Sequence, residues 1–247
     1  METMKAVRIH TCGSPEVLKF EDAPRPEPAS GEVLIKVKAA GINPIDWKTR
    51  AGCLKDHRPY VFPLILGWDV SGIIEATGLD GTRFKKGEEV YARTDIARNG
   101  AYAQYNVAKQ VEVAQKPKSI DHIRAAAIPL AAVTAWQALF DAAGLSAGQR
   151  ILIHGAAGGV GSFAVQLAKW RGADVIGTAW ARNQTFIHEL GADEAIDYTK
   201  TRFDDVVRDV DVVFDTVAGQ TQIRSWKVLK KVEFWFPLRA LHPRKTP

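Results

Sequence analysis

Residues 151–161 read Ile-Leu-Ile-His-Gly-Ala-Ala-Gly-Gly-Val-Gly, and this stretch decides the fold of the second half of the chain. Its apolar start leads into a glycine-rich turn, and an apolar helix with Phe163, Leu167 and Trp170 follows. A strand, a glycine-rich turn and a helix in this order are typical of a dinucleotide-binding unit, because small residues let backbone N–H groups approach a pyrophosphate. The start of the helix adds unpaired N–H donors and the positive end of the helix dipole.

The turn itself supplies most of the candidate cofactor-binding residues. They are Gly155, Ala156, Ala157, Gly158, Gly159, Val160 and Gly161. The usual fingerprint is Gly-x-Gly-x-x-Gly, and Ala156 stands where its first glycine is expected. A packing turn that holds no ligand is the alternative interpretation.

Outward from this stretch, the chain follows two different patterns. After residue 120, apolar strands expected at 151–154, 174–178, 194–197 and 211–215 alternate with helices, which predicts a parallel sheet wound on both faces. Before residue 120, short strands are expected at 4–9, 16–21, 33–40, 70–77, 89–93 and 103–107, with Gly and Pro between them. Many short strands of this kind predict a partly open β-barrel or a small β-sandwich.

The end of the second strand of the parallel sheet indicates which nucleotide binds. An acidic residue there accepts hydrogen bonds from the adenosine ribose of NAD and repels the 2′-phosphate of NADP. The stretch Ile176–Asn183 contains no acid, and Arg182 offers a guanidinium suited to a phosphate. The sequence therefore favours NADP(H), although Arg182 alone could be an ordinary surface arginine.

Composition excludes several other classes of protein. Of the residues, 46% are hydrophobic and 25% are charged, and the formal net charge is +5. Basic and acidic residues alternate along most of the chain, so we expect no nucleic-acid partner. No apolar stretch is long enough to span a membrane. Two cysteines and an N-terminus without a secretory pattern lead us to expect a cytoplasmic protein.

Three further motifs accompany the glycine turn: Ala40–Trp47 (AGINPIDW), Leu66–Gly72 (LGWDVSG) and Ala132–Leu139 (AVTAWQAL). With them, the chain resembles the medium-chain dehydrogenase/reductase superfamily, specifically its quinone oxidoreductase (zeta-crystallin-like) branch. The resemblance covers about residues 5–230. It implies a GroES-like β-barrel domain at 1–120 and an α/β Rossmann domain at 121–231, with an atypical tail at 232–247.

The resemblance also implies roles for single residues. Asn43 and Thr134 are expected on the nicotinamide side of the cofactor, and Tyr198 near the adenosine phosphate. The position of the cofactor at the switch between the first and fourth strands adds Val217, in the loop after 211–215. A loop-capping Asn, a helix Thr and a strand-end Tyr remain the structural alternatives. Relatives suggest a homodimer, which the tail puts in doubt for this chain.

Zinc-dependent members of the superfamily place a cysteine ligand where this chain has Asn43, and Gly-His-Glu where it has Gly67-Trp68-Asp69. None of the histidines pairs with a cysteine at ligand spacing, so we expect no metal site. No catalytic acid is assigned, and Asp46 is expected to stabilise its own turn. The expected activity is hydride transfer from NADPH to a small electrophilic acceptor, a quinone or an α,β-unsaturated carbonyl. An enoyl-thioester reductase and a non-catalytic NADPH-binding protein are the alternatives.

The tail departs from the pattern of the rest of the chain. Residues 232–247 follow neither the period of a strand nor that of a helix over a useful length. We therefore expect a C-terminally truncated Rossmann sheet of four strands, whose fourth strand forms an uncovered edge that favours aggregation. A chain of this kind is expected to turn over poorly, unless the aromatic run Phe234–Phe236 covers part of the gap.

Overall fold

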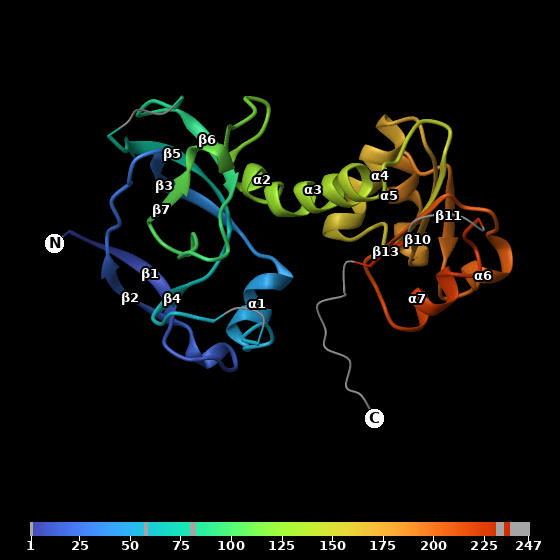
Figure 1. Ribbon diagram of the computed structural model, residues 1–247, viewed down its shortest axis with the longest axis horizontal. Coiled ribbons are helices and arrows are strands. Elements are labelled where there is room, and N and C mark those ends of the chain that lie inside the picture. Colours follow the sequence, from blue (N-terminus) through green and yellow to red (C-terminus); the bar gives the residue numbers. More distant parts are fainter. Residues whose placement is uncertain (1, 57–58, 80–82, 231–234, 238–247) are drawn as a thin grey trace. The chain divides into compact units, whose positions relative to one another are not determined.

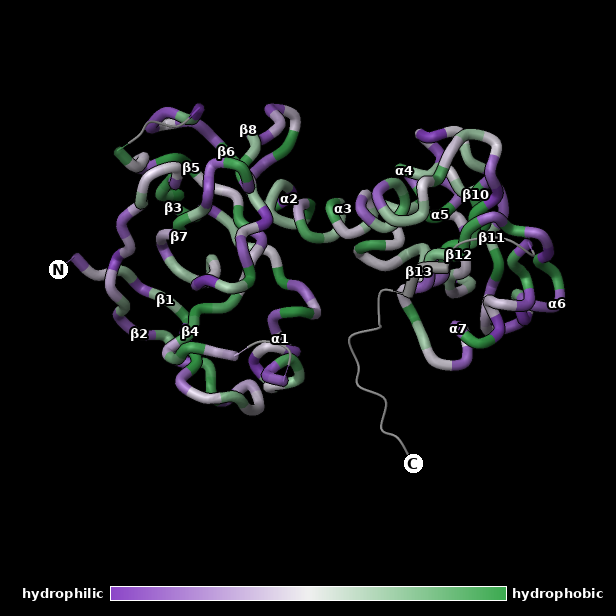
Figure 2. Tube along the Cα trace, in the orientation of Figure 1, coloured by the Kyte–Doolittle hydropathy of each residue, from purple (hydrophilic) through white to green (hydrophobic). Residues whose placement is uncertain are grey.

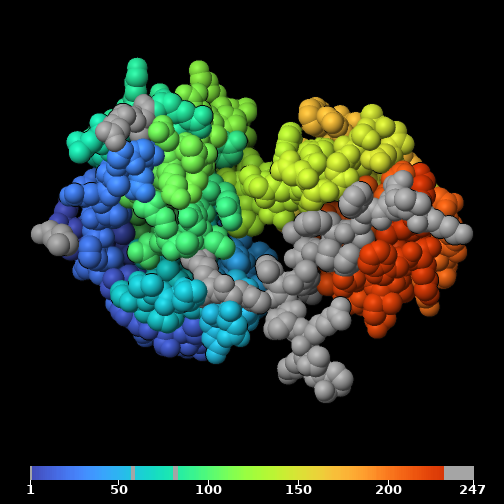
Figure 3. Space-filling view, viewed as in Figure 1, coloured from blue at the N-terminus to red at the C-terminus, as the bar shows by residue number. Residues whose placement is uncertain are grey.

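The structure is a computed structural model that describes residues 2–56, 59–79, 83–230 and 235–237 of the chain. It divides into two compact units, Met1–Leu130 and Ala131–Pro247. Figure 1 shows the course of the chain, and Figure 3 shows the first unit in blue to green and the second in yellow to red. The division falls after Leu130, and not after residue 120 as expected, because α2 (His122–Ala126) packs against strands of the first unit.

The first unit is built from two antiparallel sheets. The larger sheet has the order β7-β3-β5-β6-β8 and the smaller one the order β2-β1-β4. The strands are β1 (Thr3–Ile9), β2 (Lys19–Pro24), β3 (Glu32–Gly41), β4 (Leu64–Ile65), β5 (Asp69–Thr77), β6 (Glu89–Arg93), β7 (Tyr105–Lys109) and β8 (Val113–Gln115). Buried Val33, Ile35, Val70 and Ile74 form the core of the larger sheet.

Two details of the first unit differ from the sequence expectation. The second strand begins at Lys19 and not at residue 16, because Pro15–Val17 forms a 3-10 helix with Pro15 in its first turn. The short strands β4 and β8 were not expected, since two and three residues are too few to show a period. After β3 in the chain, α1 (Pro44–Arg50) begins directly after Asn43.

The second unit is a parallel sheet with the order β11-β10-β9-β12-β13. Its strands are β9 (Arg150–His154), β10 (Asp174–Ala179), β11 (Glu194–Asp197), β12 (Val212–Asp215) and β13 (Trp235–Pro237). This is the strand order of a Rossmann fold, with β9 as its first strand. Ile151 and Ile153 pack into one buried cluster and Leu152 into another, so β9 is apolar on both faces, and the hydropathy along the trace can be followed in Figure 2.

Helices of the second unit follow the expected alternation. They are α3 (Pro129–Trp136), α4 (Gly159–Trp170), α5 (Gln184–Glu189), α6 (Phe203–Val206) and α7 (Gln220–Ser225). After Trp136 the helical chain continues as a π-helix over Gln137–Ala142, and Gly144 then turns the chain with a φ of +61°. The last helix, α7, is shorter than the expected span of 221–230.

One expectation about the tail is wrong. Residues Trp235–Pro237 form β13, which pairs in parallel with β12 through the Cα partners Val213↔Trp235 and Asp215↔Pro237. The sheet therefore has a fifth strand, and the fourth strand is not an uncovered edge along these residues. Residues 231–234 and 238–247 lie outside the described part of the chain. The argument for a poorly active chain that rested on the uncovered strand accordingly falls away.

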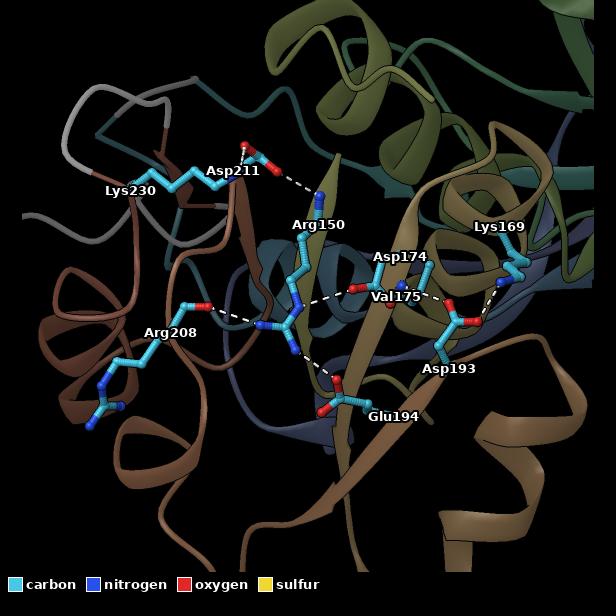
Figure 4. A network of polar contacts seen from close by, with 9 residues as sticks. All are labelled: Arg150, Lys169, Asp174, Val175, Asp193, Glu194, Arg208, Asp211 and Lys230. Carbon is cyan, nitrogen blue, oxygen red and sulfur yellow. Dashed lines mark hydrogen bonds and ion pairs between the residues drawn. The ribbon is translucent and has the colours of Figure 1, made fainter. Parts of the chain in front are cut away.

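Arg150 ties together the amino-terminal ends of four neighbouring strand segments (Figure 4). Its Nε donates to Asp174 at 3.0 Å and its Nη2 to Glu194 at 2.6 Å, while its backbone N–H donates to Asp211 at 2.7 Å. A further guanidinium N–H donates to the carbonyl of Arg208 at 3.0 Å. These carboxylates stand at or just before the starts of β10, β11 and β12, so the side chain and the backbone N–H of Arg150 together hold the end of the sheet opposite the glycine turn.

Across residues 2–56, 59–79, 83–230 and 235–237, no helix is long and apolar enough to cross a membrane. Over the same ranges, no group of three or more His, Cys, Asp or Glu side chains is arranged to hold a metal ion.

The Arg150 cluster leads to a prediction about stability. Replacing Arg150 with Met should lower the free energy of unfolding by about 1–2 kcal/mol, because two ion pairs and the side-chain hydrogen bond to the carbonyl of Arg208 are lost together. The matched control is Lys169→Met, which removes the single ion pair with Asp193 and should cost less than about 1 kcal/mol. Urea denaturation measures both values, and equal losses in the two variants would show that Arg150 does not clamp the sheet.

Candidate cofactor site

Two adjoining pockets lie at the carboxyl ends of the strands in the second unit. The glycine-loop pocket has a volume of about 460 Å³ and is lined by Gly155, Ala157, Gly158, Thr178, Ala179, Trp180, Arg182, Asn183, Tyr198 and Thr216. The second pocket, of about 290 Å³, is lined by His154, Gly155, Thr178, Tyr198, Phe203, Val217, Thr221 and Arg224. The two share Gly155, Thr178 and Tyr198, so together they form one continuous candidate site.

The glycine turn adopts its shape because of backbone constraints that only small residues satisfy. Gly155 has a φ of +68°, and a Cβ built on it would lie 2.5 Å from Oγ1 of Thr216. That hydroxyl is held in place, since it donates to the carbonyl of His154 at 2.8 Å. A Cβ on Gly161 would overlap the carbonyl oxygen of Gly155, so glycine at 161 lets α4 approach the end of β9.

Ala156, which replaces the first glycine of the usual fingerprint, is accommodated by a second glycine. Its side chain is fully buried, and its backbone N–H donates to the carbonyl of Thr178 at 3.1 Å. The Cβ of Ala156 lies 3.0 Å from the place that a Cβ on Gly177 would occupy. Gly177 in β10 therefore makes room for the methyl group of Ala156, and the turn keeps its position over the sheet.

The start of α4 is suited to an anion. Gly158 is the N-cap of this twelve-residue helix, and its first turn contains no acidic residue. The unpaired N–H groups and the dipole of a helix start attract phosphate groups. Gly155, Ala157 and Gly158 line the pocket, whereas Ala156 and Gly161 are buried beneath it. Gly159 and Val160 form the first turn of α4 and do not line it.

The far end of the glycine-loop pocket contains the residues expected to select the nucleotide. Arg182 and Tyr198 both line it, although they are separated by a helix and a strand in the sequence. No Asp or Glu is among the lining residues. The sequence did not indicate Trp180, whose ring lies beneath the guanidinium of Arg182, with 4.7 Å between Cζ and the ring centroid.

His154, which lines the second pocket, is buried and uncharged. His154 is 1% exposed, and its two ring nitrogens lie 3.1 Å from the hydroxyls of Thr178 and Ser225. Burial lowers the pKa of His154 to about 4, so the imidazole is neutral at pH 7. His154 ends β9, and the sequence did not single it out or indicate that it is buried.

Asp215 shapes the loop that carries Val217. It is 1% exposed, and its Oδ1 accepts hydrogen bonds from the backbone N–H groups of Val217 at 2.8 Å and Ala218 at 3.0 Å. Ala218 has a φ of +68°, a conformation that such a pair of hydrogen bonds helps to hold. The structure therefore places Val217 on the wall of the second pocket, beside the glycine turn.

In the first unit, Asn43 belongs to a buried polar cluster. Its backbone N–H donates to Oδ2 of Asp46 at 2.6 Å, and its side-chain Nδ2 donates to Oδ2 of Asp69 at 2.9 Å. Asp46 also accepts the hydroxyl of Tyr102 at 2.8 Å. Asp46 thus stabilises the start of α1, and Asp69 fixes the orientation of the Asn43 amide.

Burial controls the protonation of this cluster. It raises the pKa of Asp69 to about 6, because desolvation of the carboxylate outweighs the hydrogen bonds from Asn43 and the backbone of Leu130. Burial and the neighbouring Asp46 raise the pKa of the Tyr102 hydroxyl, so Tyr102 remains a hydrogen-bond donor at neutral pH.

Trp68 and Thr134 complete the residues selected from the sequence. The Trp68 side chain is 0% exposed, and its Nε1 donates to the carbonyl of Arg98 at 3.0 Å. Thr134 lies half-buried in α3 of the second unit. Neither Asn43 nor Thr134 lines the two pockets beside the glycine turn. Their expected place beside the nicotinamide therefore stays a prediction.

Comparison with known proteins identifies the family. The Alcohol dehydrogenase GroES-like domain matches residues 29–118, and the Zinc-binding dehydrogenase domain matches residues 159–232. A quinone oxidoreductase structure from Coxiella burnetii superposes with a TM-score of 0.85 and 38% identity, covering 95% of this chain and 75% of that one. The chain belongs to the medium-chain dehydrogenase/reductase superfamily, in its quinone oxidoreductase branch.

Other members of the superfamily widen the comparison. The chloroplastic quinone-oxidoreductase homolog of Spinacia oleracea is 44% identical over 191 residues, which is 75% of this chain and 58% of that protein. The 2-methylene-furan-3-one reductase of Solanum lycopersicum is 39% identical, over 92% of this chain and 60% of that protein. A mycobacterial structure complexed with NADPH has a TM-score of 0.82 at 31% identity, over 94% of this chain and 72% of that one. The chain spans under two thirds of the length of these two curated relatives.

The close approach at Gly161 predicts how the site responds to substitution. A Gly161→Ala variant should bind NADPH at least about a hundredfold more weakly, because α4 must move away from the end of β9. Isothermal titration calorimetry measures the affinity. The matched control is Gly159→Ala: a Cβ there meets no atom within 4 Å, so the second unit should unfold at an unchanged temperature. Unchanged NADPH binding by Gly161→Ala would show that the turn only packs.

The buried Asp69 predicts a pH dependence of stability. A folded-state pKa of about 6, above the ordinary value, means that the protonated carboxyl is the form that the fold favours. The contribution of Asp69 is then complete below the unfolded pKa and is lost as the pH rises through about 6. The free energy of unfolding of the wild type minus that of Asp69→Asn should fall between pH 4 and pH 6, as measured by urea denaturation. A difference that stays flat or rises with pH would contradict this account.

Proposed function

We propose that this chain binds NADPH and reduces a small electrophilic acceptor, a quinone or an α,β-unsaturated carbonyl, without zinc. The observation that carries the proposal is the glycine-loop pocket, which combines a helix start, a turn of small residues and an arginine with no acid in its lining. A bound dihydronicotinamide supplies the hydride. The role of the protein is to bind the nucleotide and the acceptor and to orient them toward each other.

The preference for NADPH over NADH rests on charge in the glycine-loop pocket. A 2′-phosphate carries negative charge, so a lining without Asp or Glu removes the repulsion that selects NAD in other Rossmann folds. Arg182 and the hydroxyl of Tyr198 line the same pocket and provide donors for phosphate oxygens. The mycobacterial relative that was solved as a complex with NADPH supports this choice.

Zinc does not fit the side chains of Asn43 and Trp68 in the first unit. At the position where zinc-dependent relatives place a histidine ligand, the buried Trp68 side chain donates its only polar hydrogen to Arg98. At the cysteine position, the amide of Asn43 is hydrogen-bonded to Asp69. An indole and an amide nitrogen are not zinc ligands. Elemental analysis of the purified protein should therefore find no stoichiometric zinc.

An acceptor that is already electrophilic suits such a site, because no metal is needed to polarise it. The names of the relatives, quinone oxidoreductase and 2-methylene-furan-3-one reductase, support quinones and enones as the class. Asn43 and Thr134 remain the candidates for contacts on the nicotinamide side. We further propose a homodimer and a cytoplasmic location; the chloroplast location in the name of the spinach relative is that protein's own.

The proposal predicts both affinity and turnover. NADPH should bind at least about tenfold more tightly than NADH, a difference of about 1.4 kcal/mol, as measured by calorimetry. With NADPH, the chain should reduce a quinone and an alkenal faster than an enoyl-CoA in a steady-state assay. Faster turnover of the enoyl-CoA would identify an enoyl-thioester reductase instead. Tight NADPH binding without turnover of any acceptor would identify a non-catalytic NADPH-binding protein.

A further inference from the structure

Trp180 and Arg182 form a stacked pair at the rim of the glycine-loop pocket. The Cζ atom of Arg182 lies 4.7 Å from the centroid of the Trp180 ring, and both side chains line the pocket. Trp180 is 45% exposed, and Trp136 and Trp170 of the same unit are at least as exposed, but Trp180 also lines the glycine-loop pocket. An exposed indole beside a binding pocket calls for a reason other than core packing.

The backbone fixes the two side chains in register. Trp180 is the N-cap of a 3-10 helix, Ala181–Asn183, and its carbonyl accepts the backbone N–H of Asn183 at 2.8 Å. The side chain of Gln184 donates to the carbonyl of Ala179 at 2.9 Å on the other side of the same turn. These hydrogen bonds hold the turn between β10 and α5. The guanidinium of Arg182 therefore lies against the ring of Trp180, two residues earlier in the chain.

Arg182 differs from Arg150 and Arg202, two other arginines of this unit, in the contacts of its guanidinium group. Arg150 and Arg202 each have a carboxylate within ion-pair distance. Among the contacts of the described residues, Arg182 has no hydrogen bond and no ion pair, and its recorded partner is the Trp180 ring. Its positive charge is therefore not neutralised by a neighbouring carboxylate, and an indole face attracts such a cation without consuming its N–H donors.

This arrangement suits a phosphate. A guanidinium that lies against a ring keeps the N–H groups at its edge free, and those groups match two oxygens of a phosphate. An arginine that is already oriented loses less conformational freedom when it binds. Tyr198 lines the same pocket and offers a hydroxyl to the same ligand.

We propose that Trp180 is a positioning residue that holds Arg182 for the 2′-phosphate of the nucleotide and thereby increases the preference for NADPH over NADH. The proposal rests on the proposed function, and it adds the residue that makes the arginine effective. Its ligand class is a 2′-phosphorylated adenosine nucleotide.

The test is a double-mutant cycle on the full chain, with NADPH and NADH as titrants in calorimetry. Trp180→Leu should weaken NADPH binding about threefold to fivefold, the size expected for an exposed cation–π contact, and leave NADH binding unchanged. Trp180→Phe, which keeps an aromatic face, should recover most of the loss. In the Arg182→Ala background, Trp180→Leu should have no further effect on NADPH, because the interaction that it removes is already absent. Thermal unfolding confirms that each variant is folded.

Three results would overturn the proposal. An equal loss of NADPH and NADH affinity in Trp180→Leu would show that the ring supports the nucleotide or the fold and not the arginine. If Trp180→Leu weakened NADPH binding just as much in the Arg182→Ala background, the ring would again not act through the arginine. If Trp180→Leu lost no NADPH affinity in the otherwise wild-type chain, the ring would have no role in nucleotide binding. Failure of the proposed function looks different: the wild type would bind the two nucleotides equally or not at all, whatever residue stands at position 180.

Discussion

The candidate site depends on the close approach of α4 to the end of β9. At Gly161 the helix backbone lies so close to Gly155 that a single added carbon would overlap its carbonyl oxygen. The same turn is pressed onto β10, where Ala156 fits against Gly177. Because the interior is closely packed, neither contact can loosen without moving the start of the helix. The end of the pocket that we propose for the phosphates keeps its shape only while these backbones touch.

The opposite end of the sheet is held by charge. Arg150 connects the starts of the neighbouring strands through Asp174, Glu194 and Asp211. In a parallel sheet, the carboxyl ends of all strands lie at one edge. Because the Arg150 cluster holds the amino-terminal ends of the strands, the loops at the carboxyl edge remain available to form a site. Arg182, Tyr198 and Val217 come from three different loops, yet they line two adjoining pockets. The Arg150 cluster at one end of the sheet and the candidate site at the other end thus both follow from the order of the parallel strands.

The sequence predicted the parts of the site that short-range chemistry determines. The run 151–161, the missing acid before Arg182 and the strand ends near Tyr198 and Val217 each have a local reason, and the structure brings them together. It did not predict β13, because three residues in an unpatterned tail show no period. It also missed Trp180 as a partner of Arg182 and the burial of His154, since both depend on which segments pack together. The roles of Asn43 and Thr134 still rest on the family resemblance.

The central claim is that the glycine turn and the pocket beside it bind the nucleotide. Mapping backbone amide chemical shifts during an NADPH titration tests it most directly, because it reports every residue at once and needs no turnover. The account predicts that the largest shifts belong to the turn, from Gly155 to Gly161, and to Arg182, Tyr198 and Val217 around the two pockets. Large shifts confined to other residues, or none at saturating NADPH, would contradict it.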